Sequence, residues 1–255
     1  MIEYNPTHPT KDVVKWPLGE LEEFFLLISV VYSPFLSQNG KLGKKFIFSK
    51  LGEYQKRELV PALDLILMAG LFYKVMNSSG QGVPIGAHAN LDHFKIIFLD
   101  VGLCQSMLNL DLSSWFLNPN NNFINKGEIV EAFIGQEFLA YSDPISKEFL
   151  YFWHREQRGS EAEIDYLVQN CNDKQFVVPV EVKVGYNKRI KSMHLFFEGH
   201  PHSNYGLRFW SHQFEIDKKI HSYPLYSVGR FLADKNVFIR EAIKHMIARK
   251  NLEMK

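Results

Sequence analysis

The chain has 255 residues, of which 46% are hydrophobic and 14% aromatic, so it can bury the core of one large domain or of two modest ones. Its 29 basic and 28 acidic side chains give a formal net charge of +1, and the overall charge therefore favours neither nucleic acids nor acidic partners. The 2 cysteines have neither the spacing of a zinc site nor that of a disulfide framework, which predicts a reducing compartment and a cytoplasmic protein.

The N-terminal residues show no signal for export or for a membrane. A basic start followed by an apolar run and a small-residue cleavage site is absent there. The longest apolar stretches, 24–32 and 59–75, are shorter than the roughly 20 residues of a spanning helix or are interrupted by Asp64. We therefore expect neither export nor membrane insertion.

Two helices are predicted in the first part of the chain. The run LGELEEFFLLISVVY at 18–32 predicts a helix that Pro34 ends, because proline lacks the amide donor and restrains the residue before it. Apolar residues at helical spacing predict a second helix, which begins after Ser49 and is closed by Gly70 in the left-handed conformation.

Short strands follow these helices. LFYKV at 71–75 and the run at 95–99 have strand character, and a loop rich in Gly, Ser and Asn at 77–90 lies between them. Helices followed by short strands are typical of a small winged helix, and we assign residues 1–92 to a winged-helix-like region.

After a linker NPNNN at 118–122, the pattern changes to alternating helix and strand. This pattern predicts an α/β (α+β) fold over 93–233, with a mixed sheet flanked by helices. An amphipathic tail helix is predicted over 234–255. The elements expected between linker and tail are a helix at 127–140, strands at 148–154, 163–169 and 176–184, a helix at 190–198 and a strand at 207–211.

The run FVVPVEVKV at 176–184 carries two charged residues on an otherwise apolar strand. Alternation places Glu181 and Lys183 on the same face, and a strand this apolar is expected to be central in its sheet. Burying these charges costs several kcal/mol unless they are paired, hydrated or bound to a metal. In the preceding strand Asp165 alternates with Ile164 and Tyr166, so a hairpin would bring Asp165 beside Glu181.

These side chains suit metal-dependent phosphodiester hydrolysis. Asp165 and Glu181 offer the hard oxygen ligands that Mg²⁺ or Mn²⁺ prefers, and Lys183 can orient the attacking water and neutralise developing charge. Glu131 lies on the core-facing side of the helix at 127–140, which makes it a third carboxylate for this site.

The order of these residues, Glu131 on a helix, Asp165 on a strand and Glu181-x-Lys183 on the next, resembles the PD-(D/E)xK nuclease superfamily. The wider sequence resembles the domain of unknown function DUF4143, which follows a P-loop ATPase in a large prokaryotic family. The segments that carry the resemblance are KIIFLDVGL at 95–103, GEIVEAFIGQEFL at 127–139, YFWHREQRGSEAEIDYLV at 151–168, VPVEVKVG at 178–185 and YPLYSVGRFL at 223–232. The resemblance implies a restriction-endonuclease-like fold in which Glu131, Asp165, Glu181 and Lys183 take the active-site positions.

Two departures from these families are visible. Ile164 precedes Asp165 where the superfamily name places a proline. GKLGKK at 40–45 has the wrong glycine spacing for a P-loop, and Lys45 replaces the required Ser or Thr. We therefore expect a naturally shortened member or a fragment without its own ATPase, and an ATPase supplied by another chain is a candidate partner.

Weaker candidates surround the main site. Lys188, Arg189 and Lys191 follow the Glu181 strand and are candidates for phosphate contacts, although an ordinary solvated loop explains them equally well. His200 and His202 have no other ligand nearby, which favours a polar loop over a metal site.

Two hypotheses follow. The first is a DNA-binding nuclease that uses Mg²⁺ or Mn²⁺. The alternative is a non-catalytic DNA- or protein-binding regulatory module, the remnant of a longer ATPase, in which the same residues form a buried polar network. A tight ion pair between Lys183 and Glu181, or DNA binding that survives removal of Asp165 and Glu181, would favour the alternative.

Overall fold

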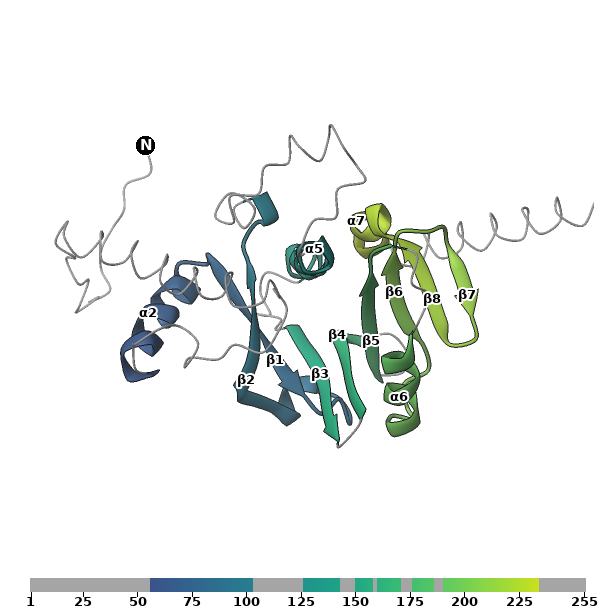
Figure 1. Ribbon diagram of the computed structural model, residues 1–255, viewed down its shortest axis with the longest axis horizontal. Coiled ribbons are helices and arrows are strands. Elements are labelled where there is room, and N and C mark those ends of the chain that lie inside the picture. Colours follow the sequence, from purple (N-terminus) through teal and green to yellow (C-terminus); the bar gives the residue numbers. More distant parts are fainter. Residues whose placement is uncertain are drawn as a thin grey trace, which may run out of the picture.

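The computed structural model describes residues 56–102, 126–142, 150–157, 160–170, 176–185 and 190–233, and these residues form a mixed α/β fold around one eight-stranded sheet (Figure 1). The helices are α2 (Lys56–Met68), α5 (Lys126–Ala140), α6 (Lys191–Gly199) and α7 (Val228–Ala233), with 3-10 turns η2 (Ile85–His88) and η3 (Leu225–Ser227). The strands are β1 (Phe72–Ser78), β2 (Ala89–Phe98), β3 (Leu150–Gln157), β4 (Ser160–Asn170), β5 (Phe176–Lys183), β6 (Gly206–Trp210), β7 (Glu215–Asp217) and β8 (Ile220–Pro224).

The strands follow the order β2-β1-β3-β4-β5-β6-β8-β7 across the sheet. β1 runs parallel to β3, β5 to β6 and β6 to β8, whereas the other neighbouring pairs are antiparallel. β5 lies in the interior of the sheet, between β4 and β6. Its valines are therefore buried on both faces, which fits its nearly continuous apolar sequence. The expected mixed α/β fold is confirmed.

Helices cover both faces of this sheet. Ile134 of α5 and Phe231 of α7 pack in one core cluster with Val180 of β5. Phe196 of α6 packs in a second cluster with Val177, which points to the opposite face of β5. The centre of the sheet is therefore closed on one side by α5 and α7 and on the other by α6.

The N-terminal strands belong to the same sheet as the C-terminal ones. β1 and β2 pair with each other, and β1 also pairs with β3, so the boundary expected at residue 92 lies inside β2. Gly70 ends α2 in the expected left-handed conformation, with φ 71°. The helix at 18–32, the linker at 118–122 and the tail helix at 234–255 lie outside the described residues.

Sequence reasoning did not anticipate β7, β8 or α7, which are all short. β8 and β7 form the edge of the sheet beyond β6. Among the helices described here, none has both the length and the apolar character needed to cross a membrane.

Candidate functional site

Helix α5 brings Glu131 to the sheet. Ala132 and Ile134 of this helix are buried, and the Tyr166 hydroxyl on β4 donates a 2.8 Å hydrogen bond to the Glu131 carbonyl oxygen. The close approach depends on Gly135, because a Cβ added there would lie 2.5 Å from the Tyr166 hydroxyl oxygen. This contact fixes the turn of α5 that carries the Glu131 side chain.

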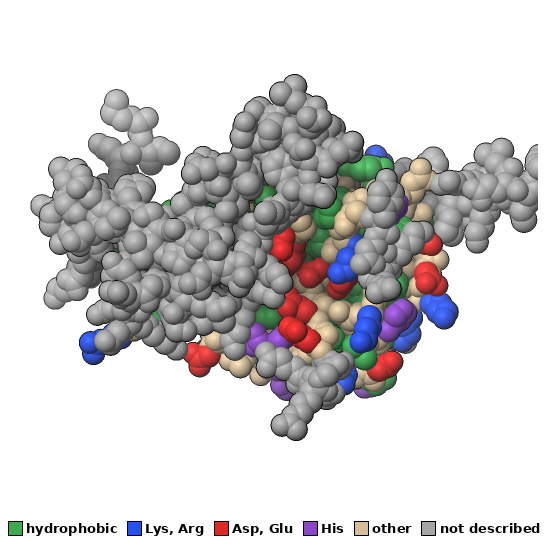
Figure 2. All heavy atoms as spheres, in the orientation of Figure 1, with side chains coloured by type: hydrophobic (Ala, Val, Ile, Leu, Met, Phe, Trp, Pro, Cys, Tyr) green, Lys and Arg blue, Asp and Glu red, His purple; other side chains and the backbone are tan. Residues whose placement is uncertain are grey.

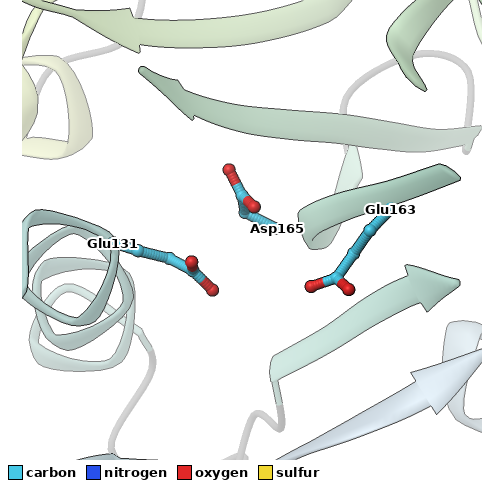
Figure 3. A group of neighbouring side chains, drawn as sticks. All are labelled: Glu131, Glu163 and Asp165. Atoms are coloured by element: carbon cyan, nitrogen blue, oxygen red, sulfur yellow. The ribbon is translucent and has the colours of Figure 1, made fainter. Parts of the chain in front are cut away.

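A bulge in β4 orients Asp165. Tyr151 pairs with Leu167 and Trp153 with Ile164, so Asp165 and Tyr166 together lie opposite a single residue of β3. Ile164 packs in the core on the α6 side and Tyr166 in the core on the α5 side, and the Asp165 carboxylate also points toward α5 (Figure 3). The strict alternation of Asp165 with Ile164 and Tyr166 expected from the sequence is thus interrupted, because the bulge inserts one extra residue.

Three carboxylates converge between α5 and β4. One oxygen each from Glu131, Glu163 and Asp165 lie within 4.8 Å of one another, and Figure 3 shows the three side chains pointing toward a common centre. Glu163 was not among the residues predicted for the site. Its signal in the sequence is the Glu-x-Asp spacing, which places both side chains on one face of a strand.

Lys95 of β2 lies within this carboxylate cluster. Its Nζ is 3.1 Å from Glu131 Oε1, forms a second ion pair with Glu163, and lies 4.7 Å from the ring centre of Phe152. The side chain is 1% exposed. Burial alone would lower the pKa of Lys95, but the charges of Glu131, Glu163 and Asp165 raise it well above its usual value. Lys95 is therefore a buried ammonium ion, and sequence reasoning did not single it out.

Asp165 connects the cluster to β5. Its Oδ2 accepts a 2.6 Å hydrogen bond from the backbone N–H of Val182, the residue between Glu181 and Lys183. At this end the paired ladder of β4 and β5 stops at Tyr166 and Val180, so Asp165 binds β5 just beyond it. Burial raises the pKa of Asp165, whereas Lys95, Lys183 and the Val182 amide act in the opposite direction.

Glu181 and Lys183 form an ion pair in which Lys183 Nζ lies 2.5 Å from Glu181 Oε1. Glu181 is 3% exposed and Lys183 33%. The second oxygen of Glu181, Oε2, is buried and has no hydrogen-bond partner. Burial and the nearby Asp165 charge raise the pKa of Glu181 to about 8, although Lys183 counteracts them.

The centre carries more negative than positive charge. Four carboxylates, from Glu131, Glu163, Asp165 and Glu181, outnumber the two ammonium groups of Lys95 and Lys183 with which they form ion pairs or interact by charge. Burial raises the pKa of Glu131 to about 8, with Lys95 opposing and Asp165 adding to the rise. Burial therefore favours the protonated forms of Glu131 and Glu181, whereas the two lysines favour their ionised forms.

The predicted residues divide as follows. Glu131 and Asp165 both belong to the three-carboxylate group, and Glu181 lies outside it. The Asp165 charge raises the pKa of Glu181, and Asp165 accepts a hydrogen bond from the neighbouring Val182 amide. Lys188 and Arg189 lie outside the described residues, and Lys191 is the exposed first residue of α6.

The two histidines expected in a polar loop have different surroundings. His202 is exposed. His200 is buried and stacked on Phe196 at 3.8 Å, and its ring nitrogens lie 2.7 Å from the Phe196 carbonyl oxygen and 2.8 Å from that of Ser79. These contacts give His200 a packing role between α6 and the loop after β1.

Fold and site together define a mixed α/β protein with a buried carboxylate–lysine centre. Residues 126–228 match the family described as "Domain of unknown function (DUF4143)", and this part of the chain is therefore a DUF4143-type region, as its resemblance indicated. Residues 32–114 match a second family, described as "Domain of unknown function (DUF8612)". Comparison with curated proteins gave no match, and comparison with solved structures gave none either.

The centre draws on both matched segments. Glu131, Glu163, Asp165, Glu181 and Lys183 all lie within 126–228, whereas Lys95 lies within 32–114. The DUF4143-type region thus supplies the carboxylates, and the preceding segment supplies the buried ammonium group that balances part of their charge.

Proposed function

We propose that this protein is a metal-dependent nuclease with a restriction-endonuclease-like fold, in which Asp165 and Glu181 hold Mg²⁺ or Mn²⁺ and Lys183 acts on the attacking water. The observation that carries the proposal is the unpartnered Oε2 of the buried Glu181, beside a centre in which carboxylates outnumber ammonium groups. Buried carboxylate oxygens are normally hydrogen-bonded, so an orphan oxygen in a charge-rich site points to a missing cation.

The donor set fits a hard divalent cation. Every candidate ligand is a carboxylate oxygen, the ligand that Mg²⁺ and Mn²⁺ prefer over nitrogen or sulfur donors. Two added positive charges would also neutralise the excess negative charge of the centre. Glu131 is an auxiliary carboxylate in this arrangement, since Lys95 already binds its Oε1.

The residues of the chain would divide the chemical work as follows. When bound, the metal polarises the phosphate and acidifies a water molecule. Glu181 holds the Lys183 ammonium through Oε1, and the partial exposure of Lys183 leaves that ammonium accessible to orient the water and to offset charge developing on the phosphate. The Val182 N–H fixes the Asp165 carboxylate against β5.

Acidic side chains gather on one face of the molecule, over the elements that carry the centre. Figure 2 shows Asp and Glu side chains gathered beside α5 and over β3 to β5, with Lys or Arg side chains next to them. Nucleic acid, with DNA as the expected substrate, would need nearby cations for its phosphates, and the exposed Lys191 at the start of α6 is one candidate. In this proposal the protein acts in the cytoplasm, and the winged-helix-like region proposed for residues 1–92 contacts DNA.

The test is calorimetric titration of Mn²⁺ into the wild type and the double variant Asp165→Ala/Glu181→Ala, followed by incubation with plasmid and single-stranded DNA. The proposal expects metal binding and cleavage by the wild type and neither by the variant. A variant lacking two exposed carboxylates, Glu198→Ala/Asp217→Ala, should behave like the wild type. A wild type that binds no metal and leaves every substrate intact would rule out the nuclease.

One observation favours a second candidate, a non-catalytic binding module. The ion pairs of Lys183 with Glu181 and of Lys95 with Glu131 and Glu163 satisfy much of the centre without a metal. For such a module, DNA binding should weaken with salt and survive the Asp165→Ala/Glu181→Ala change, with no cleavage in any sample.

A further inference from the structure

Lys95 sits where three carboxylates converge, a place that would otherwise suit a metal ion. Its ammonium contacts Glu131 and Glu163 directly, and the Asp165 oxygen lies within 4.8 Å of the oxygens of both glutamates. An ammonium group and a small divalent cation make similar demands, because both bind several oxygens at short range. The group that fills the cluster is thus a cation of the protein itself.

The Lys95 ammonium is held in place from several directions. β2 brings it to the centre from the edge of the sheet, and the ring of Phe152 on β3 lies beneath it at 4.7 Å. Since the side chain is almost fully buried, these contacts leave the ammonium little freedom to move into solvent. A lysine held this way gives the cluster a permanent single positive charge.

Asp165 lies between the carboxylate cluster that holds Lys95 and the ion pair of Glu181 and Lys183. On one side its carboxylate belongs to the group with Glu131 and Glu163, and on the other its Oδ2 binds the Val182 amide between Glu181 and Lys183. A carboxylate in such a position can serve two cations at once, as in phosphodiesterases that place two metal ions about 3.5–4 Å apart.

We propose that the Lys95 ammonium takes the place of the second metal ion, so that the centre works with a single divalent cation between Asp165 and Glu181. This inference rests on the proposed nuclease function. Lys95 is a positioning residue here: it fixes Glu131 and Glu163 and supplies one positive charge beside Asp165, where a two-metal enzyme has two. The wild type should therefore bind one Mn²⁺ per chain.

The experiment compares Mn²⁺ stoichiometry in the wild type and in Lys95→Met, by calorimetry and by electron paramagnetic resonance of the bound ion. Methionine keeps an unbranched side chain that is one atom shorter than lysine, and it removes the charge. We expect one ion per chain in the wild type and two in the variant, with spectral broadening from two neighbouring Mn²⁺ ions. Lys74→Met, at a half-buried lysine of β1 that pairs with Asp64, is the matched control and should bind one.

The outcomes separate this inference from the nuclease proposal. If the wild type and Lys95→Met both bind one ion, the role of Lys95 is refuted while the metal site stands. If the wild type binds none and the variant binds one, Lys95 occupies a cation position but the proposed metal-dependent function fails. If neither binds Mn²⁺, both proposals are overturned.

A further experiment is needed if Lys95→Met does not fold in the absence of metal. In that case Mn²⁺ should restore its circular dichroism spectrum, because the ion replaces the missing ammonium. The variant Lys95→Met/Glu131→Gln/Glu163→Gln, which no longer needs that charge, should fold without metal. If the triple variant folds but Mn²⁺ fails to restore Lys95→Met, the inference is overturned.

Discussion

Replacing Glu181 with glutamine probes the protonation of the buried centre. The pKa of this carboxyl group rises from 4.5 to about 8 on folding, because of burial and the charge of Asp165. Between these two pH values the folded protein holds a proton that the unfolded chain releases. The stability contributed by this proton is fully present below pH 4.5 and is lost as pH rises through about 8.

The size of the effect follows from the shift. At about 1.4 kcal/mol per pKa unit, a rise from 4.5 to about 8 sets an upper limit of roughly 5 kcal/mol. Glutamine mimics the protonated acid at every pH but loses the ion pair with Lys183, which lowers the expected gain. We expect Glu181→Gln to unfold like the wild type at pH 5 and to be more stable by about 2–4 kcal/mol at pH 9.

The assay is urea unfolding followed by tryptophan fluorescence between pH 5 and 9, with a chelator present to exclude metal ions. The difference in the free energy of unfolding between the two proteins should grow as pH rises from 5 to about 8 and level off above it. Glu198→Gln, at an exposed position of α6, controls for the loss of one negative charge and should follow the wild type. Parallel pH profiles of Glu181→Gln and wild type would refute the reasoning.

Three further predictions concern the packing of the site and its chemistry. Gly135→Ala should destabilise the protein by about 1–3 kcal/mol in thermal unfolding, because its Cβ would lie 2.5 Å from the Tyr166 hydroxyl oxygen. Adding Tyr166→Phe should recover part of the lost stability. If it recovers none, the contact with the hydroxyl group is not the cause of the loss. Mn²⁺ should bind more tightly at pH 8.5 than at pH 6.5, because binding displaces protons from Glu131 and Glu181, both with a pKa of about 8. Calorimetry in buffers of different ionisation enthalpy counts the protons released. An affinity that does not change with pH would contradict the prediction. Lys183→Met should keep Mn²⁺ binding within a few-fold but lower kcat for DNA cleavage about 100-fold or more, and unchanged cleavage would remove Lys183 from the mechanism.

Local patterns in the sequence were sufficient to predict much of the central fold. The apolar run around Glu181 predicted a buried strand, and β5 is buried along nearly its whole length. The order of helix and strands from α5 to β6 followed from periodicity and turn residues alone. These features depend on residues that are close in the sequence, and they can therefore be predicted from one sequence.

Contacts between distant segments were not predictable in the same way. Lys95 reaches the centre only because β2 pairs with β1 and β1 with β3, and no local signal in the sequence encodes that register. The bulge that turns both Asp165 and Tyr166 toward α5 likewise depends on the pairing of β4 with β3. A strict alternation rule cannot anticipate an inserted residue.

The parallel pairing of β1 with β3 has a consequence for any attempt to isolate the DUF4143-type region. A fragment cut at the start of α5 would lose β1 and β2, and β3 would become an edge strand with a row of unpaired backbone N–H and C=O groups. Such an edge invites strands from other molecules, so we expect the fragment to self-associate where the longer chain stays dispersed. The N-terminal segment thus covers a strand edge of its neighbour that would otherwise be open to other molecules.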